Sequence, residues 1–254
     1  MNMFKRLLIS LQFFTRIPIP AAIGFDPDWL RHAAGFFPLV GLLVGAICAA
    51  TAALAGHWLP PGVALTLSMI VGAWLTRAMH EDGFADVCDG FGGGWERERV
   101  LAIMKDSCVG SFGLVGMALI LLFKYQTLAA QPALAAALVF AHPVSRLMAT
   151  VLIWRLDYAR SGESKASAVA RHMSSADFAL ALVTGLVPAW LLAVWLGAPQ
   201  RALALGLLCA LLAAAALARL FVRRIGGYTG DCLGAVQQVS EVAIYAGFLL
   251  VIHL

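Results

Sequence analysis

Long apolar stretches dominate the sequence and restrict what the chain can fold into. Each has close to the roughly 20 residues that an α-helix needs to cross the hydrocarbon core of a bilayer. They cover residues 35–58, 62–79, 110–129, 132–154, 178–196, 202–221 and 239–254. Short polar connections separate them. This pattern is typical of a chain that crosses a membrane repeatedly as helices.

The composition supports the same fold class. Hydrophobic residues make up 61% of the chain and charged residues only 13%, against about 45–50% and about 25% in soluble domains. A net charge of +4 without a run of basic residues gives no indication of a nucleic-acid partner. We predict an all-α, polytopic transmembrane bundle of about seven spans, forming one integral membrane domain over residues 1–254. A homo-oligomer stays possible.

The first 31 residues form a distinct N-terminal segment. Leu7, Leu11 and Phe14 fall on one helical face, whereas Arg16 and Pro18 follow where a signal peptide would show a small-residue cleavage site. We expect residues 1–31 to contain an uncleaved helix that lies in the membrane interface. A short soluble arm is the alternative.

The distribution of basic residues predicts the topology. The connections 57–61 and 130–131 contain no Lys or Arg, and 197–201 contains only Arg201. The opposite connections carry most of the others. Because positive residues stay on the cytoplasmic side, we expect a multi-pass protein of the cell inner membrane with a cytoplasmic N-terminus. The carboxylate-rich loop 80–109, and with it the active site, would also be cytoplasmic.

Three aspartates follow the second apolar stretch at a spacing that predicts a shared helical face. Asp82, Asp86 and Asp89 lie within roughly 60° of one another on a helix that would continue the second stretch without a break. Like charges so placed repel, and a hard divalent cation such as Mg²⁺ would relieve the repulsion. The alternative is a solvated helix end that pairs with Arg97 or Arg99.

The residues after this helix add candidates for binding phosphate. A glycine cluster that includes Gly92 and Gly93 would end the helix and let backbone N–H groups approach a phosphate, or would form only a flexible turn. Lys105, Asp106 and Ser107 stand before the third apolar stretch. Lys105 would contact phosphate, and Asp106 would bind metal or act as a base; an ion pair between them is the alternative.

Polar residues elsewhere would complete such a site. Arg146 and Arg160 are candidate phosphate clamps because guanidinium binds phosphate with two hydrogen bonds; Arg146 could equally mark the inner membrane interface. Asp231 lies in a glycine-rich segment that we expect to form a loop at the membrane boundary. It would serve there as a metal ligand or as a base. Glu241 would face the bundle interior, or pair with Lys124.

These motifs together resemble the adenosylcobinamide-GDP ribazoletransferase family, also called cobalamin synthases. The resemblance rests on His-Glu-Asp-Gly-Phe-Ala-Asp-Val-Cys-Asp-Gly at 80–90, Lys-Asp-Ser at 105–107 and Gly-Gly-Tyr-Thr-Gly-Asp at 226–231. The segments 11–18 and 37–41 are similar to that family too. The resemblance therefore covers nearly the whole chain, with the motifs in order.

One position departs from the family pattern. Cys108 stands where the family is expected to carry arginine after Asp-Ser. If that arginine contacts phosphate, its role would pass to Lys105, Arg97 or Arg99, or be absent.

The resemblance implies a Mg²⁺-dependent transferase that joins adenosylcobinamide-GDP to α-ribazole or its 5′-phosphate and releases GMP, in the last assembly step of cobalamin biosynthesis. It also implies roles for the carboxylates. The metal ligands would be Asp82, Asp86 and Asp89. Glu81 or Asp106 would assist them, and Asp231 or Asp106 would accept the proton of the attacking ribose hydroxyl.

Other functions compete with this hypothesis. A CDP-alcohol phosphotransferase would show an arginine in a D-G-x-x-A-R pattern, but Asp86 ends the corresponding run here. An aromatic prenyltransferase would need a second aspartate-rich motif, for which Asp231 alone is a poor substitute. A transporter would place ionisable groups near the bilayer midplane, whereas nearly all carboxylates of this chain gather on one side.

Overall fold

The computed structural model describes residues 2–24, 26, 29–160 and 173–253. Over these residues the chain is helical and has no strand; an isolated β-bridge joins Tyr158 and Tyr228. The predicted all-α fold is confirmed. The helix predicted near the N-terminus is α1 (Met3–Phe14), followed by the short turns η1 (Ala21–Ile23) and α2 (Leu30–Ala33).

Six helical segments are long and apolar enough to cross a membrane. They are Ala34–Ala55 (η3, Ala34–Phe36, with α3, Phe37–Ala55), Ser111–Ala129 (α7), Leu134–Arg155 (α8), Ser175–Trp195 (α10, Ser175–Ala181; η4, Leu182–Leu186; α11, Val187–Trp195), Gln200–Ile225 (α12) and Gly230–Val251 within α13 (Gly230–His253). A seventh candidate is the bent pair of α4 (Pro61–Leu75) and α5 (Met79–Gly93). With six or seven candidate spans, the prediction of a multi-pass membrane protein with about seven spans is confirmed.

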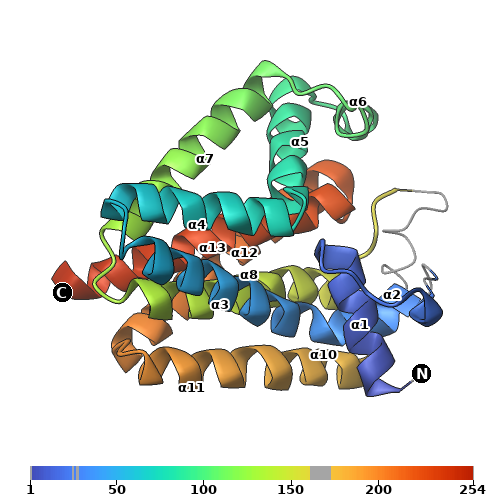
Figure 1. The fold of residues 1–254 in the computed structure, drawn as a ribbon. Helices are drawn as coiled ribbons and strands as arrows, with labels where there is room; N and C mark the ends of the chain where they lie inside the picture. Colours follow the sequence, from blue (N-terminus) through green and yellow to red (C-terminus); the bar gives the residue numbers. More distant parts are fainter. Residues whose placement is uncertain (1, 25, 27–28, 161–172, 254) are drawn as a thin grey trace.

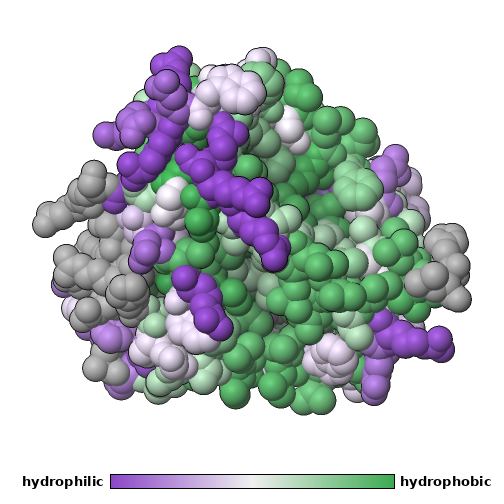
Figure 2. Space-filling view, turned by 180° about the vertical axis from the view of Figure 1, so that it is seen from behind, coloured by the Kyte–Doolittle hydropathy of each residue, from purple (hydrophilic) through white to green (hydrophobic). Residues whose placement is uncertain are grey.

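Helix α8 lies at the centre of the bundle, surrounded by α3, α11, α12 and α13 (Figure 1). Within its apolar window 89% of residues are buried, against 22% for α7 and α12. The outer helices instead expose large apolar side chains such as Leu119 and Leu212, and hydrophobic residues cover a broad face of the molecule (Figure 2). A surface of this kind is suited to contact with lipid tails.

The second span does not run without a break into the carboxylate segment, and that prediction was wrong. Helix α5 turns by 86° relative to α4, and the two helices are seen almost at right angles in Figure 1. Arg77 and Ala78 form the corner with φ angles of 60° and 52°, in the left-handed region that L-residues rarely adopt. The Arg77 guanidinium donates to the carbonyl of Thr15 at 2.9 Å, which holds the corner against the end of α1. Helix α5, which carries the carboxylates, is therefore not a continuation of α4 and is not among the six unbroken spanning segments.

The last helix begins earlier than the sequence indicated. The glycine-rich segment predicted as a loop contributes its second half to α13, which starts at Gly230. Only the four residues from Gly226 to Thr229 connect α12 to α13, and Gly226 adopts φ 77° at the end of α12. Asp231 therefore lies in the first turn of α13, on a rigid element.

Helices α5 and α13 approach each other through glycine. A Cβ atom at Gly83 would lie 2.9 Å from the backbone of Asp231, and one at Gly234 would lie 3.0 Å from the carbonyl oxygen of His80. No side chain fits in these positions without moving a backbone. The close approach brings the start of α5 against the start of α13, and this contact positions the site described below.

We predict that Gly83→Ala destabilises the protein by about 1–3 kcal/mol, because the added methyl group overlaps backbone atoms. Gly93→Ala in the same helix is the matched control, since its Cβ would lie 3.4 Å from the flexible end of Ile103. Thermal unfolding in detergent measures both. Equal midpoints for the two variants would contradict the proposed close packing.

Candidate active site

A cavity of about 240 Å³ lies among the ends of α1, α3, α5, α8 and α13. Its polar side chains come from three of these helices: His80 and Asp82 from α5, Arg146 from α8, and Asp231 and Gln237 from α13. Apolar side chains form much of the remaining wall, namely Phe13, Phe14, Phe37, Met79, Ala149, Ile153 and Leu233. Residues far apart in the sequence thus surround one small space in which two carboxylates meet an arginine.

A third carboxylate stands beside this pair. Asp86 lies one turn along α5 from Asp82 and is half-buried. Burial, and then the charges of Asp231 and Asp82, raise the pKa of Asp86 to about 7. Three like charges in this corner repel one another, so the arrangement favours a cation between them.

Arg160 supplies part of the required positive charge. Its Nη2 donates to Asp231 Oδ2 at 2.8 Å and to the carbonyl oxygen of Met104 at 3.3 Å. Thr229 Oγ1 donates to the same Asp231 oxygen at 3.2 Å. One oxygen of Asp231 is therefore held in place, while the carboxyl group still lines the cavity.

Arg146 reaches the cavity from the centre of the bundle and is only 3% exposed. Its Nη1 donates to the carbonyl oxygen of His142 at 2.9 Å. Its Nε is buried and makes no hydrogen bond. A buried guanidinium with an unsatisfied donor is suited to binding an anion, which is one of the two roles that the sequence left open for Arg146.

Sequence reasoning assigned no role to His80 or to the aromatic wall. His80 stacks on Phe14 with ring centroids 5.6 Å apart, and burial lowers the pKa of His80 well below its ordinary value. Phe14 in turn contacts Phe37 edge-on at 4.5 Å. All three residues lie in segments that carry the resemblance: Phe14 in 11–18, Phe37 in 37–41 and His80 in 80–90.

Asp89 has a different environment from Asp82 and Asp86. Its Oδ2 accepts from Gly110 N at 2.7 Å, and its Oδ1 accepts from Gly113 N at 2.8 Å. Both oxygens thus satisfy backbone donors at the start of α7. Over the described residues no group of three His, Cys, Asp or Glu side chains could hold a metal ion.

Glu81 and Asp106 lie outside the 240 Å³ cavity. Glu81 accepts from Gln238 Nε2 at 3.1 Å and faces a smaller cavity deeper in the bundle. Asp106 accepts from Cys108 N at 3.1 Å in its own loop and lines a third, more open cavity of about 400 Å³. Cys108, which stands in place of the expected family arginine, lines the same third cavity, and so does Arg99.

The remaining predicted phosphate contacts are dispersed. Arg97, in α6 (Arg97–Ile103), donates to the carbonyl oxygens of Ile225 and Ala159 at 2.8 and 2.7 Å, so two of its nitrogens connect the end of α12 to the segment after α8. Two further candidates lie elsewhere: Gly92 packs against Phe112, and Gly93 lines the 400 Å³ cavity. Lys105 and Ser107 are exposed in the loop before α7.

The fold and this cavity define a class: a multi-pass membrane protein with a cavity at which carboxylates and arginine donors come together. Comparison with known proteins makes the assignment specific. A family model described as cobalamin-5-phosphate synthase matches residues 6–249. The chain belongs to that family and is an enzyme, which confirms the resemblance and removes the transporter from consideration.

Similar proteins from several bacteria carry one name, adenosylcobinamide-GDP ribazoletransferase. The relative from Ralstonia nicotianae is 47% identical over 246 residues, which cover 94% of this chain and 93% of the relative. The relative from Leptothrix cholodnii is 44% identical and that from Shewanella oneidensis 42%, each over 96% of this chain and 95% and 93% of the relative. No solved structure matches the chain.

We predict that Asp86→Asn stabilises the protein when divalent cations are removed. The unfolded carboxyl has a pKa near 3.8 and the folded one near 7, so its ionisation disfavours the folded state. The cost is absent below the lower value and complete above the higher one.

The thermal midpoint in EDTA should accordingly rise for Asp86→Asn at pH 8 and show little gain at pH 4. Glu98→Gln is the control, because Glu98 is exposed on α6 and its removal relieves no crowding. An Asp86→Asn midpoint equal to that of Glu98→Gln at pH 8 would refute the repulsion.

Proposed function

We propose that this enzyme transfers the cobinamide phosphate of adenosylcobinamide-GDP to α-ribazole or its 5′-phosphate, producing adenosylcobalamin or its 5′-phosphate and GMP. The supporting observation is the cavity in which Asp82, Asp231 and Arg146 converge. The names of the relatives supply the substrates. A diphosphate is the part of those substrates that such a set of groups would bind.

Cavity size limits which part of the substrate enters. A space of about 240 Å³ is far smaller than a corrinoid, so the corrin ring would stay outside while the diphosphate and the attacking ribose enter. The Nε of Arg146, buried without a partner, would donate to the diphosphate. The aromatic wall that includes Phe14 and Phe37 would exclude water from the reacting groups.

A magnesium ion is the proposed cofactor. Asp82 and Asp86 are the best-suited ligands, since Mg²⁺ is commonly held by one or two carboxylates together with substrate phosphates, and their crowding with Asp231 suits a cation. Asp89 is outside this set because its two oxygens cap α7. Bound Mg²⁺ would neutralise negative charge that develops on the leaving GMP.

The chain's own residues would carry the proton and orient the substrates. A ribose hydroxyl oxygen forms a bond to the phosphorus that carries cobinamide, and the bond from that phosphorus to the oxygen of GMP breaks. The hydroxyl proton would pass to Asp231, whose Oδ2 is held by Arg160 and Thr229 and whose Oδ1 would accept it. Arg146 would hold the diphosphate in line.

We also propose that the protein lies in the inner membrane with the site on the cytoplasmic side. The excess of Lys and Arg on one set of connections supports this orientation. Soluble nucleotide substrates would then reach the cavity from the cytoplasm.

The proposed function predicts Mg²⁺-dependent release of GMP by the purified protein when both substrates are present. Asp82→Asn should lower kcat by about 100-fold or more, as expected for removal of a group that stabilises charge in the transition state. EDTA should abolish the reaction of the unmodified protein. Chromatographic quantification of GMP measures each rate.

Glu98→Gln serves again as the control, because it removes an exposed carboxylate from α6 and should retain full turnover. Elution of each variant as a single species in detergent shows that it is folded. Normal GMP release by Asp82→Asn would disprove the assignment of Asp82. Failure of the unmodified protein to release GMP with Mg²⁺ would disprove the function.

A further inference from the structure

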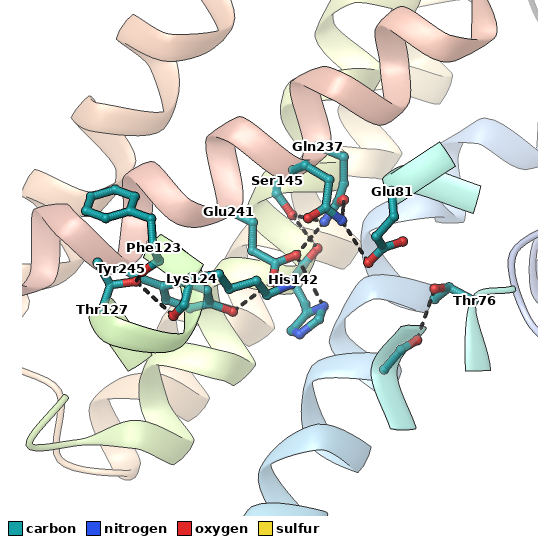
Figure 3. Close-up of polar contacts among 12 residues, drawn as sticks. Thr76, Glu81, Phe123, Lys124, Thr127, His142, Ser145, Gln237, Glu241 and Tyr245 are labelled. Carbon is teal, nitrogen blue, oxygen red and sulfur yellow. Dashed lines mark hydrogen bonds and ion pairs between the residues drawn. The ribbon is translucent and has the colours of Figure 1, made fainter. Parts of the chain in front are cut away.

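A second, smaller cavity lies directly behind the proposed active site. It has a volume of about 20 Å³, roughly the room that one water molecule requires. His80, Arg146 and Gln237 line both cavities and form the wall between them. Polar side chains from α5, α7, α8 and α13 meet here, as Figure 3 shows, and among them Lys124, His142 and Glu241 are buried.

Glu241 of α13 is fully engaged in this cluster. Its Oε1 accepts from Lys124 Nζ at 2.6 Å and from Tyr245 Oη at 3.0 Å. Its Oε2 accepts from Gln237 Nε2 at 2.5 Å and lies 3.7 Å from His142 Nδ1. Both oxygens therefore have partners, and the pairing with Lys124 that the sequence left open is confirmed (Figure 3).

Arg146, by contrast, has no carboxylate within 4 Å among the described residues. Its Nη1 lies 3.4 Å from His142 Nδ1, and His142 in turn lies 3.7 Å from Glu241. A single imidazole thus separates the guanidinium from the nearest fully buried anion of the cluster. In a low-dielectric interior an uncompensated cation so near a carboxylate would be drawn to it.

We infer that Lys124 is a positioning residue: by pairing with Glu241, it keeps that carboxylate from Arg146 and leaves the guanidinium for the substrate's diphosphate. The inference rests on the proposed function for the identity of the anion. It gives a role to the buried Lys124–Glu241 pair, which takes no direct part in the proposed reaction. A lysine without this purpose, serving only to join α7 to α13, is the competing explanation.

The test begins with Lys124→Met. Loss of the ammonium leaves Glu241 without its cation, so the carboxylate pairs with Arg146 across the position of His142. The KM for adenosylcobinamide-GDP should rise about tenfold or more, as expected when a charge-assisted hydrogen bond is lost, with a smaller change in kcat. An unchanged KM would overturn the inference.

The double variant Lys124→Met/Glu241→Gln separates the two explanations. It removes the competing carboxylate together with its partner, so Arg146 is again available and the KM should return to within about threefold of the original value, below one charged hydrogen bond. If the pair served only to join helices, the double variant would be at least as defective as Lys124→Met. That result would overturn the inference.

Binding of inorganic pyrophosphate, measured by calorimetry, gives a readout independent of turnover. We expect the unmodified protein and the double variant to bind it, and Lys124→Met and Arg146→Gln to bind weakly. Pyrophosphate binding as weak in the double variant as in Arg146→Gln would contradict the inference. If Lys124→Met does not elute as a folded species, Lys124→Gln replaces it, and the double variant still decides.

These measurements distinguish the inference from the proposed function. Pyrophosphate binding in the expected order without GMP release by the unmodified protein would refute only the function. Normal GMP release with the same KM in Lys124→Met would refute only the inference.

Discussion

The contact between the first turns of α5 and α13 is the constraint on which the proposed site depends. Gly83 and Gly234 allow the two backbones to approach so closely that a methyl group at either position would contact the backbone of the other helix. This approach brings Asp82 and Asp231 to one cavity. The free energy needed to hold like charges together comes from packing elsewhere in the bundle, since the carboxylates themselves repel.

The buried charges inside the bundle also depend on their neighbours. A buried ion is stable only when it is paired or when a ligand will pair it. Lys124 and Glu241 satisfy each other at 2.6 Å, and removal of either partner alone is expected to cost about 3–5 kcal/mol. Arg146 is the exception, because its Nε is buried without a partner. This unpaired arginine in the cavity wall is consistent with the proposed binding of a diphosphate.

The geometry also separates groups that the aspartate spacing had combined. Asp82, Asp86 and Asp89 share a helical stripe, as the i, i+4, i+7 pattern predicted, because α5 is helical through Gly93. Yet the N-terminus of α7 lies against the far end of that stripe and engages Asp89. Spacing along a helix fixes a direction for each side chain, but the neighbouring element decides which chemical group the side chain meets.

The sequence by itself determined the helical membrane fold, the candidate carboxylates and the family, because apolar length and motif order are local properties of the chain. Only the tertiary structure decided the 86° corner before α5, the early start of α13 at Gly230 and the division of Glu81 from Asp82 between two cavities. Each of these depends on contacts between residues far apart in the sequence, such as Arg77 with Thr15 and Gln238 with Glu81. Such contacts form only when the helices pack, and no periodicity within one segment encodes them.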